Sequence, residues 1–191
     1  MCGRIQTLNH VLSSCLKALE EGRYTYRHNE IIREIVNNID KNCEGQEVYA
    51  DIEGHTVGGG TIPPDILVTA EKPDIVIINR QPQDNEKFIS IIELTVPWEE
   101  RLEISRELKT NKYTSLINDL KEAGFSVDFI PLEVGVRGII TKANKSSIKK
   151  IHQFTRDIKL SSFTSLISKK AVIPSYYIFL NHNNHDWKTC N

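Results

Sequence analysis

Two apolar runs, each holding one carboxylate, constrain the fold of this chain more than any other feature. The runs DIVII at 74–78 and FISIIELTV at 88–96 are rich in β-branched residues, and the polar QPQDNEK between them is typical of a hairpin connection. We therefore expect two neighbouring central strands. A carboxylate that leaves water must be paired with a cation or bind a metal, so Asp74 and Glu93 are expected to share such a partner.

The rest of the chain alternates between helical and strand patterns. Helices are predicted at 28–39, with Asn29 as the cap, and at 98–123, 144–158 and 162–170, and further strands at 47–52 and 125–134. A long turn-rich segment, GHTVGGGTIPPD, follows the first of these strands. This order is typical of an α/β domain with a mixed central sheet flanked by helices.

Two lysines fall on the apolar side of the helix predicted at 98–123. Lys109 and Lys112 share one arc of roughly 100° with the apolar residues of that helix. Those residues are Leu102, Tyr113, Leu116 and Leu120. Because this stripe faces the sheet, the lysines are expected to reach Asp74, Glu93 or a bound phosphate, although they could also extend around the helix edge into water. The sequence does not choose between the two lysines.

Oxygen ligands such as paired carboxylates favour Mg²⁺ or Mn²⁺. Asp65 also follows a proline and competes with Asp74 for the first ligand position, but its run ILVTA is shorter and borders the glycine-rich segment. Asp51 lies in a predicted strand, where a hydrogen-bonded structural role and a ligand role are equally open. Glu30 could approach a second cation or be an ordinary exposed side chain.

The net charge of −1 conceals an uneven distribution of charge. Residues 137–170 carry nine Lys or Arg against a single acid, whereas the preceding part of the chain is acidic. A polyanion would therefore approach from the carboxy-terminal side, where Lys145, Lys149 and Lys150 are predicted to bind nucleic acid. A solvated helical surface is the alternative interpretation.

Four short segments occur in a recognisable order. RHN at 27–29, KPDIVII, IIELT and KTNKY resemble the PD-(D/E)XK, restriction-endonuclease-like fold, and most closely the endonuclease domain of site-specific non-LTR retrotransposons. The resemblance covers about residues 23–140. The usual lysine two positions after the strand acid is replaced by Thr95. In the retrotransposon enzymes the lysine function lies in the following helix, which the KTNKY segment matches.

The resemblance implies a metal-dependent DNA endonuclease that hydrolyses a phosphodiester by attack of water. Asp74 and Glu93 would bind Mg²⁺ or Mn²⁺, and either Lys109 or Lys112 would be the catalytic lysine. Arg27 and His28, from the RHN segment, would contact the DNA. A catalytically inactive nucleic-acid-binding remnant of such an element is the alternative function.

A second resemblance concerns the amino terminus. Cys2, His10 and Cys15 match three of the four ligands of the C-x2-C-x7-H-x4-C zinc knuckle that precedes the endonuclease in these retrotransposon proteins. Because a structural zinc site needs four ligands, we expect zinc only in a longer parent protein, with a cysteine two codons before Met1 and a reverse transcriptase further upstream. The tail offers weaker ligand candidates in His182, His185 and Cys190.

Three segments are predicted: a truncated zinc knuckle at 1–22, a nuclease-like domain at 23–160, and a carboxy-terminal helix and tail at 161–191. No apolar run approaches the roughly 20 residues of a membrane span. The amino terminus has no apolar stretch of the kind found in secretory signals. We therefore expect a nuclear or cytoplasmic protein that does not bind membranes.

Overall fold

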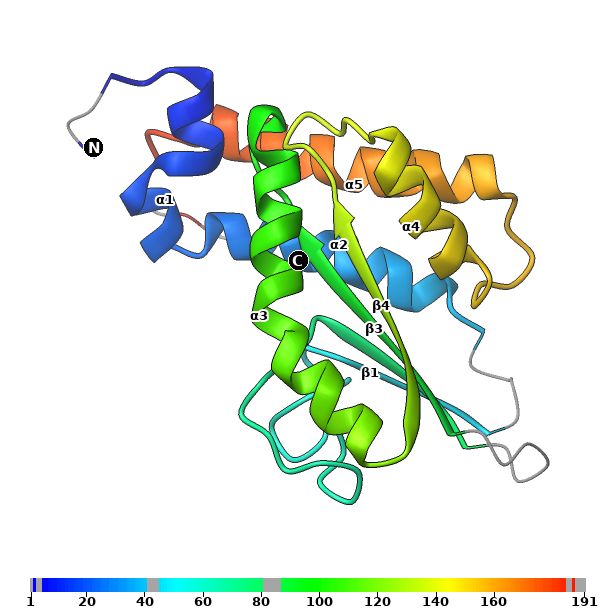
Figure 1. The fold of residues 1–191 in the computed structure, drawn as a ribbon. Coiled ribbons are helices and arrows are strands. Elements are labelled where there is room, and N and C mark those ends of the chain that lie inside the picture. Colours follow the sequence, from blue (N-terminus) through cyan, green and yellow to red (C-terminus); the bar gives the residue numbers. More distant parts are fainter. Residues whose placement is uncertain (1, 3–4, 41–44, 81–86, 185–186, 188–191) are drawn as a thin grey trace.

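A four-stranded mixed sheet lies at the centre of the computed structural model, which describes residues 2, 5–40, 45–80, 87–184 and 187 (Figure 1). The strands are β1 (Gln46–Ala50), β2 (Ile75–Asn79), β3 (Lys87–Thr95) and β4 (Phe125–Glu133), in the spatial order β1-β2-β3-β4. β2 pairs antiparallel with β1 and β3, and β4 pairs parallel with β3. The predicted α/β class, with a mixed sheet flanked by helices, is confirmed.

Helices cover both faces of the sheet (Figure 1). They are η1 (His10–Ser14), α1 (Leu16–Glu20), α2 (Arg23–Asn38), η2 (Glu99–Arg101), α3 (Leu102–Glu122), α4 (Lys142–His152) and α5 (Leu160–Leu180). α2, α4 and α5 pack on one face, and α3 packs on the other. Within the described residues, no helix combines the length and the apolar character needed to cross a membrane.

The alternation of side chains along the strands separates two cores. Ile75 and Ile77 of β2 face α2 and α5, whereas Val76 and Ile78 face α3. All four side chains are buried, which explains why this strand is a continuous apolar run instead of an alternating one. The structure thus confirms the two predicted central strands and their antiparallel pairing.

The helix α3 connects the two parallel strands, and its position determines which side chains can reach the strand ends. A parallel pair requires a crossover that returns along the sheet, so α3 runs back over β3 and β4. Its buried residues Tyr113, Leu116 and Leu120 pack on the sheet as the predicted stripe required. The residues preceding Tyr113 therefore lie above the carboxyl ends of β3 and β4.

Two helices are longer than predicted. α2 begins at Arg23, after Gly22 with a left-handed φ of 69°, so Asn29 lies inside the helix and is not its cap. α5 continues to Leu180 through Pro174 because its buried face packs against the rest of the molecule. Residues of α5 such as Phe163 join the main core, so this predicted carboxy-terminal helix is packed into the domain.

Candidate active site

Asp74 and Glu93 meet at one end of the sheet. Asp74 immediately precedes β2, and the register that pairs Ile75 with Ile92 continues to place Asp74 opposite Glu93. The backbone N–H of Asp74 donates to Glu93 Oε2 at 3.2 Å. Only 9% of Asp74 and 2% of Glu93 is exposed, so two acidic side chains share a site with little access to water.

Asp74 is held from two sides. Its Oδ2 accepts a hydrogen bond from the backbone N–H of Leu94 at 2.7 Å and lies 3.2 Å from Nε2 of His28 on α2. Burial lowers the pKa of His28, but the hydrogen bond and charge of Asp74, with the charge of Glu93, outweigh burial and raise that pKa overall. Oδ1 of Asp74 has no hydrogen-bond partner among the described residues.

Glu93 is paired with Lys109 of α3, whose Nζ contacts Glu93 Oε1. Burial, followed by the charge of Asp74, raises the pKa of Glu93, and the Lys109 ammonium offsets part of that increase. The Lys109 side chain is 30% exposed, so it reaches from the molecular surface into the carboxylate pair. Lys109 is therefore one of the partners that the sequence analysis required for these acids.

Lys112 occupies a different environment. Its ammonium lies 3.3 Å from Glu71 and donates to the hydroxyl of Tyr113 at 3.0 Å. The Lys112 side chain is 47% exposed, and its ring contact and ion pair hold it at the helix edge. Of the two predicted lysines, the structure places Lys109 at the carboxylates and Lys112 beside Glu71.

A cleft of about 410 Å³ opens next to the carboxylate pair. It is lined by α2, by the end of β3 with the residue that follows it, by the residue after β1, and by Lys109. The lining residues are Tyr24, Thr25, Arg27, His28, Asn29, Asp51, Leu94, Thr95, Val96 and Lys109. A substrate phosphate entering this cleft would meet the ammonium that pairs with Glu93.

Arg27, expected to contact DNA, lines the cleft but is only 2% exposed, and its contact with DNA stays a prediction. Its guanidinium donates to the carbonyl of Leu12 at 2.9 Å, to the hydroxyl of Ser175 at 3.2 Å and to the carbonyl of Val96 at 3.3 Å. Burial lowers the pKa of Arg27 to about 10, which leaves it charged at neutral pH. Arg27 joins α2, α5 and the end of β3.

The other acids considered as metal ligands lie in environments different from that of Asp74 and Glu93. Asp65 is exposed and pairs with Arg80 at 2.8 Å, and no strand forms in the ILVTA segment after it, so it does not replace Asp74. Glu30 lies 3.2 Å from the Lys170 ammonium and is partnered there. Asp51 is exposed just beyond β1, and it lines the cleft while its backbone N–H donates to the carbonyl of Asp74 at 2.9 Å.

A third buried acid, Glu133 at the end of β4, was not predicted from the sequence. It is 1% exposed and accepts from Nε of Arg106 at 2.9 Å. Its Oε1 and the neighbouring Thr95 hydroxyl are buried, and neither has a hydrogen-bond partner among the described residues. Arg106 also donates to Asn144 of α4 at 2.9 Å. An acid inside the apolar run FIPLEV is the same signal that identified Glu93 and would have found this residue.

The predicted basic surface lies on α4. Lys145 and Lys149 are exposed, and neither has an ion-pair partner within the described part of the chain. Lys150 is also exposed but lies 2.7 Å from Asp128 of β4. Because Arg106 ties α4 to α3, this basic surface is fixed relative to the helix that carries Lys109.

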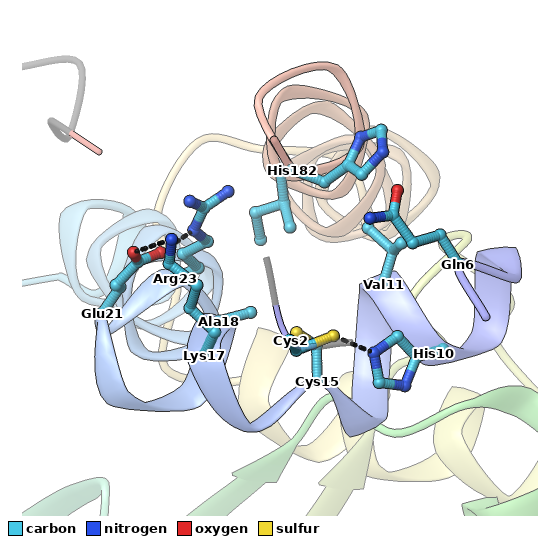
Figure 2. A pocket seen from close by; sticks show the side chains of 11 residues that line it. Cys2, Gln6, His10, Val11, Cys15, Lys17, Ala18, Glu21, Arg23 and His182 are labelled. Atoms are coloured by element: carbon cyan, nitrogen blue, oxygen red, sulfur yellow. Dashed lines mark hydrogen bonds and ion pairs between the residues drawn. The ribbon is translucent and has the colours of Figure 1, made fainter. Parts of the chain in front are cut away.

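The three predicted zinc ligands come together near the amino terminus (Figure 2). The ligand atoms of Cys2, His10 and Cys15 all lie within 4.8 Å of one another, and Cys2 Sγ is 2.9 Å from His10 Nε2. His182 lines the same pocket, but its ring is turned away from both sulfurs (Figure 2). The other tail candidates, His185 and Cys190, lie outside the described residues.

No known protein family and no curated protein matches the sequence. The function is therefore inferred from the geometry and the chemistry of the site's own residues, together with the resemblance of the short segments that carry them.

Proposed function

We propose that this chain is a metal-dependent DNA endonuclease domain in which Asp74 and Glu93 bind Mg²⁺ or Mn²⁺. The observation that carries the proposal is the meeting of two buried carboxylates from adjacent strands with the Lys109 ammonium, beside a cleft. The charge of Asp74 raises the pKa of Glu93, and a bound cation would favour the ionised form of both groups. Their oxygen donors, including the unpartnered Oδ1 of Asp74, are of the type that Mg²⁺ and Mn²⁺ prefer.

The described residues can divide the work of phosphodiester hydrolysis among them. When bound, the cation would polarise the phosphate and make a coordinated water more acidic. Leu94 and His28 fix the orientation of Asp74, which pre-organises one ligand. Lys109, at the edge of the cleft, can orient the attacking water or offset the charge that develops on the phosphate.

DNA is the proposed substrate for two reasons. The order of the RHN, PD, ELT and KxxKY segments resembles retrotransposon endonucleases, and α4 presents Lys145 and Lys149 without acidic partners among the described residues. Ammonium groups of this kind bind a phosphate backbone without reading its sequence. The same two lysines favour the second candidate function, a nucleic-acid-binding remnant without catalysis.

We propose that the amino-terminal segment supplies three of the four ligands of a structural zinc site. Cys2, His10 and Cys15 place two thiols and one imidazole close enough to share an ion, and these are the ligands that zinc prefers. Replacing zinc by Co²⁺ gives a direct test, since thiolate-bound Co²⁺ has a charge-transfer absorption that Cys15→Ser should weaken. An unchanged spectrum would contradict the proposed ligand set.

The endonuclease proposal is tested by nicking of supercoiled plasmid in Mn²⁺ or Mg²⁺, with a chelator as control. We expect metal-dependent nicking by the wild type, none by Asp74→Asn, and wild-type activity in the matched variant Asp65→Asn, whose carboxylate pairs with Arg80. DNA binding is measured in parallel by gel shift. Binding without nicking in any metal would support the non-catalytic alternative and contradict the endonuclease.

A further inference from the structure

We propose that Lys109 holds Glu93 in place of the metal in the metal-free protein, and that a divalent cation binds by displacing its ammonium. This inference rests on the proposed metal-dependent function and adds how the same site is loaded. It assigns Lys109 a role before catalysis, as a competitor of the cation for one carboxylate oxygen.

Both oxygens of Glu93 are already engaged. Oε2 accepts from the backbone N–H of Asp74 at 3.2 Å, and Oε1 contacts the Lys109 ammonium. The first contact is made by a backbone group at the start of a central strand, so it cannot be released without disturbing the sheet. The second is made by a flexible side chain. A cation that bridges Glu93 and Asp74 therefore gains an oxygen most easily at the expense of Lys109.

Lys109 can leave at a small cost, because its side chain is 30% exposed and its ammonium can be rehydrated. The residue lines the cleft next to the carboxylates, so the displaced ammonium remains beside the path of a substrate phosphate. Loading of the cation and release of the lysine toward the substrate would then be one event.

If Lys109 competes with the cation, its removal should change the affinity for metal. If Lys109 acts only in catalysis and takes no part in metal binding, its removal should leave the affinity for Mn²⁺ unchanged. Removing a competing ammonium should increase it, because the cation no longer has to break an ion pair or sit near a positive charge. The two roles are therefore separated by a binding measurement that involves no DNA and no cleavage.

The experiment is a calorimetric titration of the full chain with MnCl₂ alone. We expect Lys109→Met to bind Mn²⁺ about three- to fivefold more tightly than the wild type, the scale of one partly exposed ion pair. Lys109→Gln is a second uncharged variant, in case the methionine variant folds poorly. Lys109→Arg keeps the charge, and Lys112→Met removes the neighbouring ammonium that pairs with Glu71; both should stay within about twofold of the wild type.

The possible outcomes separate this inference from the function on which it rests. If the wild type binds Mn²⁺ and both uncharged Lys109 variants bind it equally or more weakly, the displacement inference is overturned while the metal site stands. If Lys112→Met tightens binding as much as Lys109→Met, the effect is one of general charge and the inference is also overturned. If neither the wild type nor any variant binds Mn²⁺, the proposed metal-dependent function itself fails.

Discussion

Replacing Glu93 by Gln removes one of two buried charges and keeps both the shape of the side chain and an oxygen for the Asp74 N–H. Burial and the charge of Asp74 raise the pKa of Glu93, so folding disfavours its charged form relative to the unfolded chain. The lost ion pair with Lys109 is partly exposed and offsets at most about 1 kcal/mol. Metal-free Glu93→Gln should therefore unfold at the wild-type temperature or above it.

Bound Mn²⁺ should make the wild type more stable to heat than Glu93→Gln. At a Mn²⁺ concentration about a hundred times its dissociation constant, binding adds about 2.7 kcal/mol to the stability of the wild type. For a chain of this size that is a rise in Tm of about 5–10 °C, most of which Glu93→Gln should lose. Thermal unfolding with and without Mn²⁺, with Asp65→Asn as control, measures both effects. A wild-type metal shift in Glu93→Gln, or a metal-free variant that melts several degrees lower, would refute the reasoning.

Three further predictions concern the surroundings of the site. Asp74→Ala leaves the Leu94 N–H without its acceptor and should lower the free energy of unfolding in urea by about 1–3 kcal/mol. Asp74→Asn keeps an acceptor oxygen and should lose less, so equal losses in the two variants would contradict this role of Asp74. Neutralising Lys145 and Lys149 together should lower the slope of log DNA affinity against log salt by about 1.8, and an unchanged slope would exclude α4 from the interface. Burial raises the pKa of Glu133, so the wild type should lose stability as pH rises from about 4.3 through that pKa. Glu133→Gln should lose less over the same range, and superimposable pH profiles would argue against this role of Glu133.

The central hairpin could be predicted because both strands are apolar on both faces. Such runs fix the strands within a residue or two, and the carboxylates then stand out as the polar exceptions. The start of α2 could not be predicted from the apolar stripe. Arg23 and Arg27 extend the four-residue spacing of Ile31 and Ile35 and are just as buried, but a hydropathy pattern places arginine on the surface. Backbone carbonyls, whose positions no sequence pattern reveals, accept from these guanidinium groups.

The choice between Lys109 and Lys112 was also beyond the sequence. Both face the sheet on a helical wheel, but they differ by about 4.5 Å along the helix axis. Only the position of α3 along β3 decides which ammonium reaches Glu93, and that position depends on how Tyr113 and Leu116 pack. The pairing of the two acids follows from the local register of the strands, whereas tertiary packing decides which lysine pairs with Glu93.

The rate of plasmid nicking by two lysine variants tests the central claim most directly. Lys109→Met and Lys112→Met remove the same charge from one helix, one turn apart, and only the first removes an ammonium from Glu93. Under single-turnover conditions in saturating Mn²⁺, we expect a loss of about a hundredfold or more for Lys109→Met and less than about threefold for Lys112→Met. Equal rates for the two variants, or a larger loss for Lys112→Met, would contradict a catalytic centre built from Asp74, Glu93 and Lys109.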